Sequence, residues 1–586
     1  ISAQTLIKHF NWLKENGYNV ISWQQVIDAE NGKGTLPDNA VLLSFDDGYE
    51  TMYNVVFPLL KAYNYPAVFA PVTGWLDTPA NQKIAYADKM LDRSVFATWA
   101  QVKEMEQSGL VEVASHTHNL HNGIKANPSG GQLPAVIAPE YKNGKYETED
   151  AYKNRLRSDF ALTVQTLVNH IGKKPRVMVW PYGQFNDVAV QIARQTGMPH
   201  YFSLGEKIIN KVGDKHIGRL LLNAETDLNT VKNYLDGIDE SKQIPRVLHV
   251  DLDYVYDANK AQQAKNLDKL IERIYRYGAT TVYLQAFSDP DGDGVADALY
   301  FPNKYLPVRD DIFGRIAWQL QTRAGVQVYA WMPVLAFDLR KSVKEAEYVI
   351  DSRTGKPSTT AYLRLSPYNN QNVEIIKSIY NDLSFHAKFN GILFHDDAFL
   401  TDFEGAEGNH AEGMVSSQAK QKTQDLIQLT HQLTDALKPY FLRGSYSLKT
   451  ARNLYASVIT NPNAEEWLAQ NLKTLTENYD TTAIMAMPYM ENEQPISQKE
   501  AYQWFASLIE NVKAQASLDK VLFEFQAVNW RTQKPIPESE LIDWMTLLQK
   551  NHIYSYGYYP DNFLTNQPDM NKMKPYFSVN TNAGKK

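Results

Sequence analysis

The feature that most constrains the fold is a repeated order of short apolar runs and helix-like segments along most of the 586 residues. Apolar runs of this length between helices are typical of strands buried in a parallel sheet. Three runs in the first half end in polar residues: 40–45 before Asp46-Asp47-Gly48, 110–115 before His116, and 176–180 before Pro181-Tyr182-Gly183. Because α/β folds place their chemistry at the carboxyl ends of strands, we expect these three ends to form a site.

The second half repeats the strand–helix order more regularly. Eight candidate strands alternate with helical patterns, at 246–254, 280–287, 326–333, 391–395, 440–446, 482–488, 521–528 and 553–559. Eight strands in roughly this many residues predict a (β/α)8 TIM-like barrel. The polar stretch 236–245 contains Gly and Pro and separates the halves. The sequence therefore predicts an α/β protein with two domains, at 1–236 and 246–575.

Composition excludes several classes of protein. The 66 acidic residues outnumber the 59 basic ones, which argues against nucleic acid as the main partner, since phosphate binding needs clustered surplus Lys and Arg. The chain has no cysteine, so disulfides and thiolate metal sites are excluded, and a metal must be held by His, Asp or Glu. No run of 18 apolar residues is present, so we expect no transmembrane segment.

A metal site is predicted from the polar residues at two of the strand ends. Of the 13 histidines, three fall within six residues, at His116, His118 and His121. Two imidazoles and one carboxylate from Asp46-Asp47 form a catalytic divalent site with open positions for water and substrate. The alternatives are an Asp-Asp-Gly turn and a polar loop with incidental histidines. Spacing alone leaves open whether His118 or His121 joins His116.

These motifs resemble the NodB-homology polysaccharide deacetylases of carbohydrate esterase family 4, which fold as a distorted (β/α) barrel. The resemblance rests on 44–48, the histidine cluster and Arg176-x-x-x-Trp180-Pro181-Tyr182-Gly183. His121 follows His116 by five positions, a variant similar to the poly-β-1,6-N-acetylglucosamine N-deacetylases of biofilm export.

The resemblance implies a role for each residue at the strand ends. Asp46 would be the general base, while Asp47, His116 and His121 would bind a divalent metal such as Zn, Co, Ni or Fe. Arg176 would orient Asp46, and Tyr182 would donate its backbone N–H to the oxyanion. Family members also use a His as general acid. The one upstream histidine, His9, lies in a helical pattern, so we expect the strand that carries the acid to precede Ile1.

Acidic residues also gather at predicted strand ends of the second half, together with aromatic residues. Such convergence suits glycoside hydrolysis, and it equally suits binding of a cationic polymer. The order of the halves and the segment 395–404 resemble the same biofilm deacetylases, whose second domain is grouped as glycoside hydrolase family 153. By that resemblance Asp402 and Glu524 are the predicted catalytic residues. The predicted substrate-binding residues are Asp251, Asp253, Trp331, Asp396, Asp397 and Tyr489.

The segment from Asp289 to Tyr300 imitates a calcium loop, with oxygen ligands at alternate positions. Its twelfth residue is Tyr300, where an EF-hand needs a bidentate Glu, so the leading interpretation is a groove-shaping loop.

The leading hypothesis is a two-domain enzyme that partly deacetylates poly-N-acetylglucosamine and then binds and cleaves the product. One alternative is a non-catalytic export chaperone, and another is a deacetylase of chitin or peptidoglycan. The resemblance further implies a periplasmic location, an outer-membrane lipid anchor on a Cys that this chain lacks, and an export porin as partner.

Overall fold

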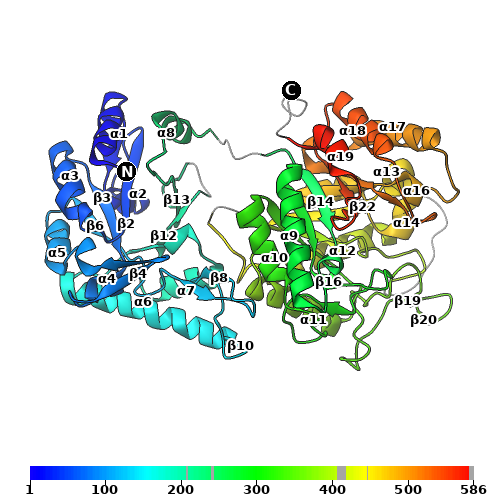
Figure 1. The fold of residues 1–586 in the computed structure, drawn as a ribbon, viewed down its shortest axis with the longest axis horizontal. Coiled ribbons are helices and arrows are strands. Elements are labelled where there is room, and N and C mark those ends of the chain that lie inside the picture. Colours follow the sequence, from blue (N-terminus) through cyan, green and yellow to red (C-terminus); the bar gives the residue numbers. More distant parts are fainter. Residues whose placement is uncertain (206–208, 239–242, 406–416, 445–446, 580–586) are drawn as a thin grey trace. The chain divides into compact units, whose positions relative to one another are not determined.

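The computed structural model describes residues 1–205, 209–238, 243–405, 417–444 and 447–579. The chain forms two compact units, one of residues 1–242 with 442–447 and one of 243–441 with 448–586 (Figure 1). The assignment of 442–447 to the first unit is a feature that the predicted boundary did not include. None of the described helices has the length and hydropathy needed to cross a membrane.

The first unit is built on seven parallel strands. One sheet has the order β1 (Asn19–Ile21), β2 (Ala40–Asp47), β3 (Ala67–Pro71) and β6 (Val111–Val113), and a second has the order β11 (Val177–Val179), β12 (His200–Leu204) and β13 (His216–Arg219). A parallel bridge between Ser115 and Met178 joins the two sheets. Apolar side chains from strands of both sheets pack together in one buried cluster, so the sheets share a core.

Helices and hairpins connect these strands. The helices are α1 (Ala3–Glu15), α2 (Trp23–Glu30), α3 (Phe57–Tyr63), α4 (Thr73–Asp77), α5 (Trp99–Gln107), α6 (Glu149–Ile171), α7 (Asp187–Gln195) and α8 (Leu228–Leu235). The hairpins are β4 (Lys83–Tyr86) with β5 (Lys89–Asp92), β7 (Gly123–Lys125) with β8 (Gln132–Pro134), and β9 (Tyr141–Lys142) with β10 (Lys145–Tyr146).

The second unit is a closed barrel of eight parallel strands. Their order is β14 (Arg246–Val250), β15 (Thr281–Gln285), β18 (Gln327–Met332), β21 (Gly391–Phe394), β22 (Lys449–Tyr455), β23 (Thr481–Ala486), β24 (Val521–Gln526) and β27 (Tyr556–Tyr559). The predicted TIM-like barrel is confirmed. Buried apolar side chains of strands and helices form one continuous core.

Eleven helices belong to the described part of this unit. They are α9 (Lys260–Tyr277), α10 (Phe313–Gln319), α11 (Asn370–His386), α12 (Ser417–Leu437), α13 (Ser457–Thr460), α14 (Glu465–Leu468), α15 (Leu472–Asn478), α16 (Pro488–Glu491), α17 (Gln498–Gln515), α18 (Glu538–Lys550) and α19 (Met570–Phe577). Three short hairpins lie in the loops: β16 (Phe287–Ser288) with β17 (Ala298–Leu299), β19 (Ile350–Asp351) with β20 (Lys356–Pro357), and β25 (Val528–Asn529) with β26 (Lys534–Pro535).

The prediction of the fifth barrel strand at 440–446 is wrong. The strand is β22, which begins at Lys449, and 445–446 lie outside the described residues. The predicted range has the more apolar pattern, whereas β22 carries Arg452 and Asn453, both buried. Arg452 donates to the Tyr479 hydroxyl and a backbone carbonyl, and Asn453 donates to Glu524. Because β22 contains polar residues that are buried with polar partners, a search for apolar runs does not find it.

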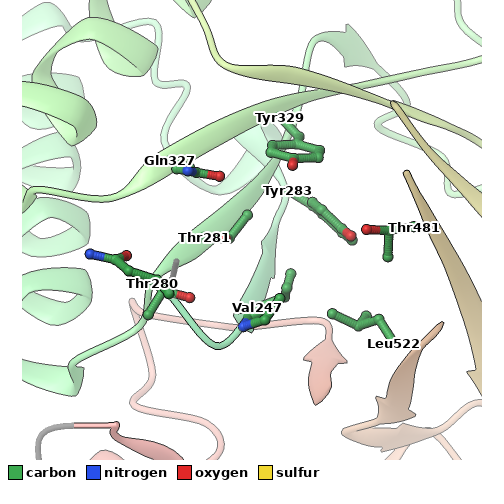
Figure 2. A pocket seen from close by; sticks show the side chains of 10 residues that line it. Val247, Thr280, Thr281, Tyr283, Gln327, Tyr329, Thr481 and Leu522 are labelled. Atoms are coloured by element: carbon green, nitrogen blue, oxygen red, sulfur yellow. The ribbon is translucent and has the colours of Figure 1, made fainter. Parts of the chain in front are cut away.

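A small cavity of about 60 Å³ lies at the amino ends of the barrel strands (Figure 2). Thr281, Gln327 and Thr481, which line it, are the first residues of β15, β18 and β23. Its lining contains no charged side chain. Since TIM-barrel enzymes use the opposite, carboxyl ends of their strands, this cavity is not the expected reaction site.

A buried ion pair between α9 and the segment after β27 gives a test of barrel stability. Arg273 donates to Asp561 at 2.6–3.0 Å, and Asp561 is completely buried. We predict that Arg273→Met lowers the free energy of unfolding of the barrel by about 3–5 kcal/mol, because it strands a buried carboxylate. Arg276→Met, which removes an exposed pair with Glu272, should cost less than about 1 kcal/mol. Urea unfolding of the two variants would contradict the prediction if the losses were equal.

Candidate active site and barrel mouth

Two adjacent carboxylates at the end of β2 point to different partners. Asp47 has a φ of 74°, in the left-handed region, which Asp tolerates better than most residues. Gly48 follows with a φ of 103° and closes the turn against Pro71 and Leu76. The backbone at the end of this strand thus separates Asp46 from Asp47 and gives each its own set of contacts.

Asp46 is held by Arg219, the last residue of β13. The guanidinium Nη1 and Nη2 each lie 2.9 Å from one Asp46 oxygen, and Nη1 also donates to the Ser44 hydroxyl. Burial alone would raise the pKa of Asp46, but Arg219 and His116 outweigh it and hold the pKa below its ordinary value. Asp46 is therefore kept ionised and fixed in direction, as a general base requires.

The prediction that Arg176 orients Asp46 is wrong. Arg176 donates from Nε and Nη2 to Glu112 at 2.9 Å and from Nη1 to Gln24. It precedes β11, whereas Arg219 ends its own strand, so only Arg219 lies at the carboxyl end beside Asp46. The short, polar strand β13 gave no clear signal in the sequence.

Asp47, His116 and His121 converge on one point. Asp47 Oδ1 lies 3.4 Å from His116 Nε2 and 3.2 Å from His121 Nε2. Among the described residues, these three side chains can bring their ligand atoms within 4.8 Å of one another. His118 is instead hydrogen bonded to Thr73 through Nδ1. The structure thus pairs His116 with His121, the choice that spacing had left open.

The arrangement of these three residues fits a divalent metal. His116 Nδ1 is hydrogen bonded to the Val179 carbonyl at 2.7 Å, which leaves Nε2 to face Asp47 and His121. Asp159 of α6 fixes the loop after β6 that carries the histidines. Its carboxylate accepts hydrogen bonds from the backbone N–H groups of His118 and Asn119. Two imidazole nitrogens and one carboxylate oxygen suit Zn²⁺ and similar ions. The identity of the metal stays a prediction.

Tyr182 lies beside this cluster in a strained conformation. Its φ of 58° is in the left-handed region, and its ring centroid is 4.5 Å from that of His121. The side chain is 42% exposed, so solvent reaches the site on this side. The oxyanion role of its backbone N–H stays a prediction.

In the barrel, Asp396 follows β21 and has a full set of donors. The hydroxyls of Tyr362 and Tyr455 donate to it at 2.8–3.0 Å, and His395 Nε2 lies 3.0 Å away. Burial opposes ionisation, but His395 and these donors hold the pKa of Asp396 below its ordinary value. Burial likewise disfavours charge on His395, yet Asp396 and Asp397 raise its pKa to about 10. Asp396 is therefore ionised beside a charged His395.

Asp397, predicted to bind substrate, has the surroundings of a framework residue instead. It is completely buried, and its two oxygens accept the backbone N–H groups of 334–336 at 2.6–3.0 Å. A carboxylate with this many amide donors and no exposure holds the loop after β18 in place. The same Asp-Asp sequence thus supplies one residue to the barrel mouth and one to its framework.

Glu524, predicted to be catalytic, lies inside the barrel. Its Oε1 is 2.5 Å from His249 Nδ1 and its Oε2 accepts Asn453 Nδ2 at 2.9 Å. Only 1% of the residue is exposed. With both oxygens engaged, Glu524 is placed to hold His249, whose ring packs edge-on against Trp331 at 4.1 Å.

Asp251 and Asp253 follow β14 and have opposite environments. Asp253 Oδ1 accepts hydrogen bonds from Arg309 Nη1 and from the Tyr300 hydroxyl, both at 2.6 Å. These two bonds fix the carboxylate in place. Asp251 is buried, its Oδ1 has no hydrogen-bond partner among the described residues, and its Oδ2 is 3.5 Å from the Tyr559 hydroxyl. Burial and the neighbouring Asp253 raise the pKa of Asp251 to about 7.

The remaining predicted barrel residues are placed as follows. Trp331 is buried between His249, His395 and Tyr559, with ring centroids 4.1–5.5 Å apart. Tyr489 is half-buried and donates to Glu540 at 2.5 Å. Asp402 lies in the half-buried loop after β21, next to the range 406–416, and its catalytic role stays a prediction.

The calcium-like loop brings three carboxylates together, from Asp289, Asp291 and Asp293. Asp289, however, accepts the backbone N–H groups of 292–294 at 2.9–3.1 Å. This carboxylate closes the turn, so calcium binding here stays a prediction.

Comparisons with known proteins match both units. A polysaccharide deacetylase family model matches residues 33–201, and a model of hypothetical glycosyl hydrolase family 13 matches 249–559. The poly-beta-1,6-N-acetyl-D-glucosamine N-deacetylase of Escherichia coli (strain K12) is 40% identical over 604 residues, which cover 99% of this chain and 89% of that protein.

Two solved structures are also similar. A de-N-acetylase from Aggregatibacter actinomycetemcomitans is 68% identical and covers 40% of this chain and 89% of its own, with a TM-score of 0.40. The PgaB (BpsB) glycoside hydrolase domain from Bordetella bronchiseptica is 38% identical and covers 58% of this chain and all of its own, with a TM-score of 0.53.

The fold and the matches together define a polysaccharide deacetylase joined to a glycoside hydrolase-like barrel. The near full-length similarity to the curated relative is more specific. The chain belongs to the poly-β-1,6-N-acetyl-D-glucosamine N-deacetylase family.

The ion pair between Arg219 and Asp46 can be tested by its effect on deacetylase activity. We predict that Arg219→Met lowers deacetylase activity about 100-fold or more, because Asp46 loses its fixed direction and its neighbouring cation. Arg176→Met removes the ion pair with Glu112, a pair that lies at the start of β11 and not beside Asp46. This variant should keep activity within about threefold. Steady-state rates on N-acetylglucosamine oligomers measure both. Equal losses would show that Arg219 has no special role.

Proposed function

We propose that the first unit removes acetyl groups from poly-β-1,6-N-acetyl-D-glucosamine in a reaction that needs a divalent metal. The observation that carries the proposal is the convergence of Asp47, His116 and His121 beside an Asp46 that is separately held by Arg219. The name of the 40% identical relative supports the choice of polymer.

The residues of the site divide the work of amide hydrolysis. A divalent ion held by Asp47, His116 and His121 would polarise the acetamide carbonyl and acidify water. Asp46, ionised and held by Arg219, accepts the proton of the attacking water at a carboxylate oxygen. The backbone N–H of Tyr182 donates to the oxygen of the tetrahedral intermediate. The leaving nitrogen takes up the proton that Asp46 accepted from water, and breakage of the C–N bond then releases acetate and leaves a free amine on the sugar.

We further propose that the barrel binds the partly deacetylated polymer and hydrolyses it. The support is the pair of buried carboxyls, Asp251 and Asp396, which lie at the carboxyl ends of β14 and β21 and have pKa values shifted in opposite directions. One protonated and one ionised carboxyl is the combination that glycoside hydrolysis uses. Asp402 stays the catalytic residue that the resemblance favours. Free amines on the polymer would be attracted to these acidic residues.

We propose a periplasmic location with an outer-membrane lipid anchor in the natural protein, and an export porin as partner. An enzyme that deacetylates a polymer during its export would encounter that polymer in the periplasm. Cell fractionation of the natural host would contradict this proposal by finding the protein in the cytoplasm.

The deacetylase proposal predicts a mass change in a defined substrate. Incubation of β-1,6-linked N-acetylglucosamine oligomers with Co²⁺- or Zn²⁺-loaded protein should remove acetyl groups one at a time, as seen by mass spectrometry. Asp47→Ala should abolish the loss, because it removes the carboxylate ligand, while the exposed Asp38→Ala should not change it. Loss of acetyl groups that persists in Asp47→Ala would contradict the assignment.

The environment of Asp251 predicts a pH-dependent stability. A folded-state pKa of about 7 against an ordinary value of about 4 means that folding favours the protonated carboxyl. The stability that this gives below about pH 4 is lost as pH rises to about 7. Asp251→Asn, which cannot ionise, should therefore raise the melting temperature of the barrel more at pH 8 than at pH 5. A difference that does not change with pH would contradict the raised pKa.

The same variant separates two roles in the barrel. If Asp251 donates the proton, Asp251→Asn should stop shortening of a pre-deacetylated oligomer without abolishing its binding. If Asp402 alone carries the reaction, only Asp402→Asn should do so. Binding without shortening by the parent protein would reduce the barrel to a polymer-binding module.

A further inference from the structure

The hairpin β4–β5 brings a tyrosine to the metal site from outside the predicted motifs. Tyr86 is the last residue of β4, and the two-residue turn after it has Ala87 at a φ of 53°. Ile84 of the same strand is buried in the core of the unit. After β5, the buried Arg93 donates to the carbonyls of Leu76, Phe96 and Ala97. Both ends of the hairpin are thus anchored to the unit.

The hydroxyl of Tyr86 contacts the carboxylate that the metal needs. It donates to Asp47 Oδ2 at 2.9 Å, while Asp47 Oδ1 is the oxygen that faces His116 and His121. One oxygen of Asp47 is therefore occupied by a protein donor and the other is directed to the two imidazoles. A carboxylate free at both oxygens can rotate and bind an ion with two atoms.

The ring of Tyr86 also contacts a second ligand. It lies nearly parallel to the His121 ring, at a centroid distance of 6.0 Å and an angle of 21°. Trp75 packs against both rings, at 5.4 Å from Tyr86 and 5.1 Å from His121. The same side chain thus limits the movement of two of the three ligands.

We propose that Tyr86 is a positioning residue that holds Asp47 as a one-oxygen ligand and keeps His121 in its direction. A one-oxygen carboxylate leaves one more coordination position open for water or the acetamide oxygen. This inference rests on the proposed metal-dependent function of the first unit. Hydrogen bonds of this kind, made to a ligand by a neighbouring side chain, commonly change metal affinity 10–100-fold.

The test compares two Tyr→Phe variants of the whole chain. Tyr86→Phe removes the hydroxyl bonded to Asp47 and keeps the ring. Tyr53→Phe is the matched control, because the Tyr53 hydroxyl donates at 2.6 Å to Glu104, another carboxylate of the same unit. Each protein is stripped of metal and titrated with Co²⁺, followed by the visible absorption of the bound ion.

Tyr86→Phe should raise the Kd for Co²⁺ by about 10–100-fold and weaken the visible bands, as expected when a second carboxylate oxygen binds. Tyr53→Phe should match the parent in both, and the melting temperatures of the metal-free variants show whether folding is kept. Parent-like affinity and spectrum in a folded Tyr86→Phe would overturn the proposal. A parent that binds no Co²⁺ would overturn the metal site itself, whereas one that binds Co²⁺ without deacetylating would contradict only the proposed function.

Discussion

The opposite directions of two neighbouring carboxylates are the constraint on which the first site depends. Asp46 and Asp47 are adjacent, and like charges this close raise each other's pKa unless each has its own positive or hydrogen-bonding partner. The left-handed backbone of Asp47 separates them. Arg219 forms an ion pair with Asp46, while the side chains of His116, His121 and Tyr86 contact Asp47. A base and a metal ligand can thus be built from one dipeptide.

Buried acidic residues in the barrel show that burial alone does not identify a functional group. Asp397 has no exposure and is used up by backbone amides. Hydroxyl donors and His395 stabilise the ionised form of Asp396, whereas Asp251 has one oxygen without a hydrogen-bond partner among the described residues. The set of partners therefore decides whether a carboxyl supports the fold, carries a charge, or has its pKa raised towards neutrality.

Most of the architecture could be predicted from strand periodicity. Seven of the eight barrel strands overlap their predicted ranges, because buried parallel strands are nearly continuous apolar runs. The strand β22 was misplaced since Arg452 and Asn453 are buried with polar partners. Motif resemblance indicated the residues at the ends of β2 and after β6. It failed for Arg219 and Tyr86, which reach the site from a short strand and a hairpin by tertiary contacts alone.

The most direct test of the account is the position of a metal in crystals of the cobalt- or zinc-loaded protein. Anomalous scattering at the metal absorption edge locates the ion independently of any assumed ligand. A metal held by the three predicted ligands gives a peak about 2.0–2.2 Å from one Asp47 oxygen and from Nε2 of His116 and His121. A loaded protein whose strongest peak lies elsewhere, such as beside Asp289, Asp291 and Asp293, would contradict it.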